Sequence, residues 1–198
     1  TSILRKVDYT VIGGGQPISI NLGSTATAYK VSPHTNDLLF VGTGAGRVFK
    51  IENASTGNYT VTEISGSNVS GYISSIDIGV DDNQILISVS NYGVESLFET
   101  MGGGGSNGWI NIEGDLPDMP IRWALYNKNN FNQTVVATEL GTWISDDISA
   151  SSPVWYPSND GLAKVRVDML AKNSNGELAA GTYGRGMFYS TGFTSTAP

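Results

Sequence analysis

Residues 39–49 read Leu39-Phe40-Val41-Gly42-Thr43-Gly44-Ala45-Gly46-Arg47-Val48-Phe49: a short apolar strand, a glycine-bearing turn and a strand with an aromatic residue. The same pattern recurs at residues 135–144 and 179–188, and a looser copy covers residues 85–98. Successive copies are 49, 46 and 44 residues apart, measured between Phe49, Phe98, Ile144 and Phe188. A period of this length with several short strands per copy is typical of β-propeller blades. We therefore predict an all-β chain of about four four-stranded antiparallel blades.

The repeats also predict the domain organisation. Each copy begins with a strand rich in β-branched and aromatic residues, and a polar turn follows it; in the last copy these are Lys164–Leu170 and Lys172–Gly176. The first three copies end in a predicted outer strand, over Asn58–Ile64, Gly108–Ile112 and Pro153–Tyr156, and the fourth lacks one. The predicted units are an outer strand in residues 1–14, blades over 15–67, 68–115 and 116–160, and an incomplete last blade over 161–190.

An unpaired strand precedes these blades. Lys6–Ile12 resembles the outer strand Asn58–Ile64, so it either completes the last blade and closes the ring or belongs to a preceding blade. We favour the preceding blade, because a four-bladed ring is at the small end of the known range. The chain is then part of a larger propeller. Its open ends would be covered by further blades of the same polypeptide or by another subunit.

Composition and charge narrow the class of protein. The 198 residues carry a net charge of −7 with scattered Lys and Arg, which argues against a nucleic-acid partner, because phosphate contacts need clustered cations. The apolar runs are far shorter than the roughly 20 residues of a membrane helix, so no membrane span is expected. The chain has no cysteine, which excludes disulfides and thiolate metal sites.

Several segments carry a resemblance beyond the period: Ser90–Val94, Asp115–Arg122, Ala137–Trp143, Asn159–Leu162 with Val165–Asp168, and Gly181–Phe188. Over about residues 24 to 190 the chain resembles the C-terminal part of sortilin-like propellers related to the bacterial neuraminidase repeat. Such propellers are common in large surface proteins of the type IX secretion pathway. The resemblance therefore implies a bacterial protein that is secreted or at the cell surface.

Two details qualify this resemblance. In those families a Gly-Arg-Gly-aromatic strand often ends the propeller, and residues 191–198 resemble the linker that follows it. The Asp-box turn of the family, Ser-x-Asp-x-Gly-x-x-x-Trp, is degenerate here. One of its nearest approaches is Ser145-Asp146-Asp147, followed at a distance by Trp155.

A sialidase site would need a cluster of arginines that binds the carboxylate of the sugar through paired hydrogen bonds. Arg122 and Arg166 follow Ile121 and Val165 at positions that correspond in the predicted first strands. Position-matched arginines in a repeat are more often structural, so we expect them to support carbonyl groups between blades. The chain has five arginines: Arg5, Arg47, Arg122, Arg166 and Arg185.

Other glycosidases need two carboxylates that lie roughly 5 Å or 6.5–9.5 Å apart. Asp77, Glu139 and Asp168 are candidates, because each lies in or just after a strand with apolar neighbours. Such carboxylates more often bond backbone groups or face solvent, and we assign no catalytic residue. His34 is the only histidine, so neither a serine-hydrolase triad nor a multi-histidine metal site is expected. We predict no metal and no cofactor.

Ligand-binding residues are expected in the turns, because loops on a rigid scaffold carry function. Tyr183 and Arg185 lie in the last turn of the repeat, and Glu139 lies in the equivalent turn of the preceding copy. The leading hypothesis is a non-enzymatic module that recognises a glycan or a surface protein, or that serves as a spacer in a larger surface protein. The alternative is a fragment of a propeller glycoside hydrolase, sialidase-like or xyloglucanase-like.

Overall fold

The structure is a computed structural model that describes residues 2–5, 17–55, 58–162 and 164–193. The described residues form seventeen β-strands, and no helix among them could cross a membrane. The predicted outer strand Lys6–Ile12 lies outside the described residues. Four antiparallel sheets follow one another along the chain, and a two-stranded hairpin of β1 (Ser2–Arg5) and β2 (Pro17–Ile20) precedes them. This confirms the predicted all-β blade architecture.

Each sheet is a meander whose first strand is innermost. The first sheet consists of β3 (Ala26–Val31), β4 (Leu39–Thr43), β5 (Val48–Glu52) and β6 (Thr60–Glu63). The second consists of β7 (Ile73–Ile78), β8 (Ile85–Val89), β9 (Leu97–Thr100) and β10 (Ile110–Asn111). The third consists of β11 (Ile121–Asn127), β12 (Asn130–Thr138), β13 (Gly141–Ser145) and β14 (Tyr156–Pro157). The fourth has three described strands, β15 (Val167–Lys172), β16 (Leu178–Thr182) and β17 (Gly186–Ser190).

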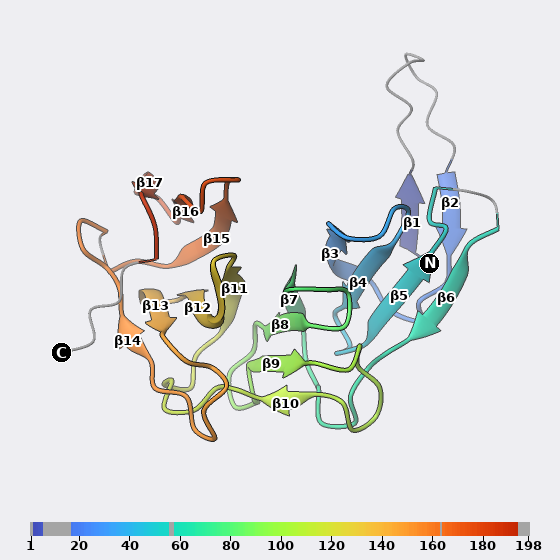
Figure 1. The fold of residues 1–198 in the computed structure, drawn as a ribbon, viewed down its shortest axis with the longest axis horizontal. Helices are drawn as coiled ribbons and strands as arrows, with labels where there is room; N and C mark the ends of the chain where they lie inside the picture. Colours follow the sequence, from blue (N-terminus) through green and yellow to red (C-terminus); the bar gives the residue numbers. More distant parts are fainter. Residues whose placement is uncertain (1, 6–16, 56–57, 163, 194–198) are drawn as a thin grey trace, which may run out of the picture.

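The sheets stand side by side in an arc, with β3, β7, β11 and β15 on its inner side (Figure 1). The inner strands run in the same direction (Figure 1), and contacts between β3 and β7 advance together along both: Thr27 Oγ1 donates to the carbonyl of Ile73 at 2.6 Å, and Lys30 Nζ lies 2.8 Å from Asp77 Oδ1. We call the end where the inner strands begin the start face, and it carries turns 43–47, 90–96, 138–141 and 182–186. The opposite end, the end face, carries turns 32–38, 79–84, 127–130 and 173–177.

Apolar side chains fill the space between neighbouring sheets. Strand β8 is buried on both sides, so its side chains alternate between two clusters. Ile85 and Ile87 pack toward the first sheet, while Leu86 packs toward the third. A further cluster joins Val135 of the third sheet to Leu170 of the fourth. The core is therefore a series of layers between sheets, which is why each sheet depends on its neighbours.

All four inner strands share one irregularity. The pairing of the first strand with the second shifts by one residue at the same place in each sheet, which leaves a bulge residue there. Such a bulge leaves one residue unpaired and re-aims its side chain. The bulge residue is polar in every sheet: Thr27, Ser74, Arg122 and Asp168.

This register corrects the sequence-based alignment of the last copy. We expected its first strand at Lys164–Leu170, with Arg166 equivalent to Arg122, but β15 spans Val167–Lys172. Val167 pairs with Thr182 as Ile121 pairs with Thr138, so Asp168 is the equivalent of Arg122. The Val-rich run Val165-Arg166-Val167 fits a strand in either register, and pairing with the second strand decides between them.

Candidate functional site

Glu139 lies on the start face and is held by an arginine of its own sheet. It follows β12, and Arg122 reaches it from the bulge of β11, with Nε 2.8 Å from Glu139 Oε1. The same guanidinium donates to Ser90 Oγ of the second sheet at 2.9 Å. Arg122 therefore joins two sheets, as expected for a structural arginine. Its ion pair with Glu139 occupies the carboxylate that the sequence suggested for ligand binding.

Tyr183 lies in the equivalent turn of the fourth sheet. Its backbone N–H donates to the carbonyl of Arg166 at 2.8 Å, and the guanidinium carbon of Arg166 lies 4.3 Å from the centre of the Tyr183 ring. Arg166 Nε is also 2.7 Å from Asp168 Oδ1. The hydrogen bond with Asp168 raises the pKa of Arg166, and the charge of Glu139 adds to this rise. Arg166 thus interacts with both residues: its guanidinium lies over the Tyr183 ring, and the charge of Glu139 acts on it.

Arg185 occupies the exposed tip of the same turn. It lies between Gly184 and Gly186, whose φ angles of 77° and 79° are in the left-handed region that glycine tolerates. No carboxylate contacts Arg185 among the described residues. The structure therefore brings Tyr183 and Arg185 together on one turn, with Glu139 on the next sheet.

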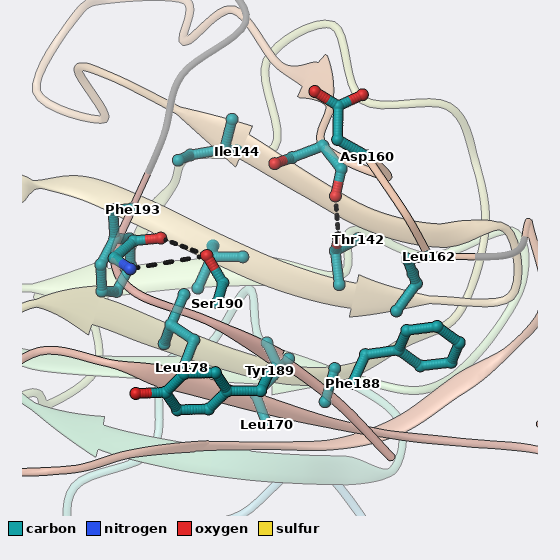
Figure 2. Close-up of a pocket in the computed structure, with 14 residues that line it drawn as sticks. Thr142, Ile144, Asp160, Leu162, Leu170, Leu178, Phe188, Tyr189, Ser190 and Phe193 are labelled. Carbon is teal, nitrogen blue, oxygen red and sulfur yellow. Dashed lines mark hydrogen bonds between the residues drawn. The ribbon is translucent and has the colours of Figure 1, made fainter. Parts of the chain in front are cut away.

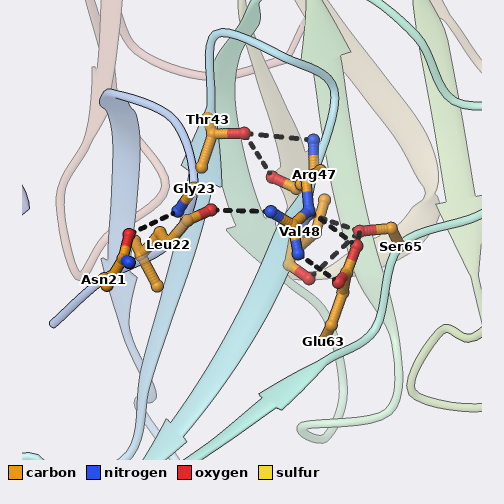
Figure 3. A network of polar contacts seen from close by, with 8 residues as sticks. All are labelled: Asn21, Leu22, Gly23, Thr43, Arg47, Val48, Glu63 and Ser65. Atoms are coloured by element: carbon orange, nitrogen blue, oxygen red, sulfur yellow. Dashed lines mark hydrogen bonds and ion pairs between the residues drawn. The ribbon is translucent and has the colours of Figure 1, made fainter. Parts of the chain in front are cut away.

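Arg47, in the corresponding turn of the first sheet, belongs to a local network (Figure 3). Its Nε donates to Glu63 Oε1 at 3.0 Å, its Nη1 donates to the carbonyl of Leu22 at 2.9 Å, and Ser65 Oγ donates to Glu63 at 2.8 Å. The hydrogen bond from Arg47 lowers the pKa of Glu63. Arg47 thus secures the segment before the first sheet. Arg47, Arg122 and Arg166 each pair with a different carboxylate, which does not support a sialidase-type cluster.

A buried aspartate links the inner strands nearer the end face. Asp77 of β7 is 1% exposed, and its Oδ1 and Oδ2 lie 2.8 Å and 2.6 Å from the Nζ atoms of Lys30 and Lys172, respectively. The backbone N–H of Tyr126 donates to Asp77 Oδ2 at 3.1 Å, and Lys172 also donates to the carbonyl of Tyr126 at 2.9 Å. One carboxylate thus connects all four inner strands.

Lys30 and Lys172 of this Lys–Asp–Lys cluster were not predicted from the sequence, although Asp77 was named as a candidate. Lys30 and Asp77 occupy the same position in their inner strands, opposite Phe40 and Leu86. Opposite charges at the same position of neighbouring repeats could have predicted this ion pair from the sequence. Lys172 was assigned to a turn, so its place on β15 was not anticipated.

Asp77, Glu139 and Asp168 each form an ion pair with a cation of the chain. Asp77 contacts Lys30 and Lys172, Glu139 contacts Arg122, and Asp168 contacts Arg166. Among the described residues, no group of three or more His, Asp or Glu side chains could hold a metal ion. His34 Nε2 lies 3.0 Å from the carbonyl oxygen of Gly79, which is a structural contact.

Another buried carboxyl was not anticipated. Glu99 on β9 accepts hydrogen bonds from Tyr126 Oη at 2.8 Å and from Gln84 Nε2 at 3.0 Å. Burial raises the pKa of Glu99, and these two hydrogen bonds oppose the rise. Both bonds reach the same oxygen, Oε1, and tie Glu99 to the second and third sheets, which favours a structural role.

A small cavity of about 100 Å³ lies between the third and fourth sheets (Figure 2). The residues that line it are largely apolar and include Ile144, Leu162, Leu178, Phe188 and Phe193. Between the other neighbouring sheets, the corresponding space is filled by apolar side chains. We interpret it as an incompletely filled interface between blades.

Comparison with solved structures shows the class of fold. The designed Ika4 protein matches with a TM-score of 0.58 at 14% identity, over 84% of this chain and 91% of that one. The Swd1 (Cps50) β-propeller domain of Myceliophteria thermophila matches with a TM-score of 0.58 at 19% identity, over 80% of this chain and 49% of that one. An ancestral GH74 enzyme matches with a TM-score of 0.57 at 14% identity, over 84% of this chain and 23% of that one.

The chain therefore has the β-propeller fold, and at these identities the likeness extends to the fold alone. It spans about half of the Swd1 chain and about a quarter of the GH74 chain. No protein-family model and no curated protein matches the sequence.

Proposed function

We propose that this chain is a non-enzymatic β-propeller module that recognises a glycan or a protein surface through its start face. The observation that carries the proposal is a set of exposed side chains at this end. Tyr92 and Tyr183 are 66% and 67% exposed, and Leu140 and Arg185 are exposed beside them in the equivalent turns. Tyrosine and arginine are enriched in binding hot spots, because they offer a large contact area and polar groups together.

The pairing of the carboxylates supports recognition over catalysis. The acidic residues singled out from the sequence are each engaged by a lysine or an arginine. A glycoside hydrolase needs one carboxyl to donate a proton and a second to act as base or nucleophile. The fold match with a GH74 enzyme does not alter this argument, because a propeller hosts many functions.

The surroundings of the module are part of the proposal. The resemblance to sortilin-like propellers of the neuraminidase-repeat type supports a protein that is secreted or displayed at a bacterial surface. In that setting the start face would contact glycans or surface proteins.

The first experiment combines a glycan array, a panel of surface proteins and a glycoside hydrolysis assay. We expect binding without hydrolysis, and binding weakened about thirtyfold by Tyr183→Ala, which corresponds to the about 2 kcal/mol of a hot-spot residue. Tyr189→Ala is the matched control, because Tyr189 is 64% exposed but lies on β17 away from the start face. Release of sugar from any glycoside would contradict the proposal. So would the absence of Tyr183-dependent binding in both arms, which favours the spacer.

A further inference from the structure

A hollow opens between the four inner strands, apart from the start-face turns. Its volume is about 460 Å³, within the about 300–1,000 Å³ that small-molecule sites span. Every sheet contributes to its wall, which includes Thr27, Lys30, Ser74, Trp123 and Lys172. The wall contains no carboxylate, and Asp77 lies beside it, covered by the two lysines.

The charges at this hollow do not cancel. Two ammonium groups face one carboxylate, which leaves one net positive charge in a chain whose overall charge is −7. Asp77 is 1% exposed, whereas the side chains of Lys30 and Lys172 are 33% and 17% exposed. The negative group is thus buried, and the positive groups remain accessible from the hollow.

The two ammonium groups also retain hydrogen-bonding capacity. Each carries three N–H donors. In the described structure Lys30 contacts Asp77, and Lys172 contacts Asp77 and the carbonyl oxygen of Tyr126. Three donors therefore remain for an acceptor in the hollow. A partly desolvated ammonium gains more from a charged acceptor than from a neutral one.

We propose that this hollow binds a carboxylate-bearing pyranose, a sugar acid of the uronate class, with Lys30 and Lys172 holding the carboxylate. The single net positive charge matches a carboxylate monoanion better than a phosphate dianion. Trp123 in the wall and Tyr29, which is 75% exposed, supply aromatic surface for the sugar ring. Thr27 donates its hydroxyl hydrogen to a carbonyl group, so its oxygen can still accept from a sugar hydroxyl. Ser74 donates to the carbonyl of Ile121 and accepts from Ser88 Oγ at 2.8 Å, which leaves its oxygen one lone pair for such a bond.

This site is separate from the start face, so the two proposals can fail independently. The start-face proposal depends on Tyr183 and its neighbours, whereas the hollow depends on the two lysines. Tyr183→Ala should leave binding in the hollow unchanged. Lys30→Gln should leave start-face binding unchanged.

The first test is an NMR titration of the unmodified chain with D-glucuronate, D-glucose and D-glucose 6-phosphate. We expect saturable shifts of the Tyr126 and Lys172 backbone amides with glucuronate, and no shift at Ser149, which lies in a distant turn. Equal affinity for glucose would overturn the carboxylate assignment, and tighter binding of glucose 6-phosphate would overturn the monoanion assignment. Absence of saturation by about 10 mM, weaker than a useful small-molecule affinity, would overturn the site.

The second test uses calorimetry on two matched lysine variants. Lys30→Gln should weaken glucuronate binding about tenfold, because it removes a charged hydrogen-bond donor. Lys50→Gln is the control: Lys50 is 34% exposed and pairs with Glu52 at 3.1 Å, outside the hollow. Equal affinity of both variants would contradict the proposal. If Lys30→Gln does not fold, as judged by circular dichroism, the NMR titration of the unmodified chain decides.

Discussion

The second and fourth sheets are copies of one repeat in different surroundings. The second lies between two neighbours, and every residue of β8 and β9 is buried. The fourth contacts the third on one side, and β17 has no buried residue. Met187 and Tyr189 of β17 are 76% and 64% exposed, whereas Ile87 of β8 is fully buried. A blade is therefore defined by its neighbours as much as by its own sequence.

The largest expected difference between the two sheets is in the free energy of unfolding when an apolar side chain is truncated to alanine. Ile87→Ala should lower the free energy of unfolding by about 3 kcal/mol, because it leaves a cavity between the first and second sheets. Met187→Ala should change it by less than about 0.5 kcal/mol, because Met187 is largely exposed. Urea unfolding of both variants measures the difference. Equal losses would mean that the fourth sheet is packed as tightly as the second.

The next comparison adds a methyl group at one repeat position. Gly42 and Gly181 both pair with the residue after the bulge, Ala28 and Met169, respectively. A Cβ at Gly42 would overlap the side chain of Ile73 in the second sheet, whereas at Gly181 the nearest atom is 3.8 Å away.

Gly42→Ala should therefore destabilise the chain by about 1–3 kcal/mol through overpacking. Gly181→Ala should be close to neutral. The added methyl group meets no close atom, and alanine loses less conformational entropy than glycine when it is fixed in strand β16. Thermal unfolding followed by circular dichroism distinguishes them. A loss at Gly181 as large as that at Gly42 would contradict the difference in packing.

The smallest effect concerns pH and the buried Glu99 of the second sheet. Burial raises its pKa above the ordinary value of 4.5, so the folded state binds a proton more tightly than the unfolded state. Stability from this group is present below pH 4.5 and falls as pH rises from there through the raised pKa, by about 1.4 kcal/mol per pKa unit. Glu99→Gln should remove this decline and be at least as stable at pH 7. Urea unfolding at several pH values tests it, and an unchanged pH profile would argue against the burial effect.

The sequence predicted the blades better than the contacts between them. The apolar strand and glycine turn around Gly42 and Gly46 are local signals, because Gly46 requires a φ of 76°. The outer strands were also located, although β14 spans Tyr156–Pro157 where Pro153 to Tyr156 was expected. The difference arises because Trp155 is buried and its backbone N–H donates to Asp115 Oδ1 rather than to a strand.

The site was harder to predict, because its residues are far apart in the chain. Lys172 and Asp77 are 95 residues apart and meet only when β15 and β7 line the same hollow. The turn residues Glu139, Tyr183 and Arg185 were named because their turns repeat, and their role in ligand binding stays a prediction. That Arg122 engages Glu139 depended on the bulge, which no local pattern indicated.

The bulge in each inner strand also makes the propeller variable at chosen points. A residue opposite no partner can be exchanged without breaking a ladder hydrogen bond. Thr27, Ser74, Arg122 and Asp168 already show a methyl-bearing hydroxyl, a smaller hydroxyl, a cation and an anion at this position. The scaffold thus offers one such position on the inner strand of every sheet, where the side chain can differ while the pairing of the strands stays intact.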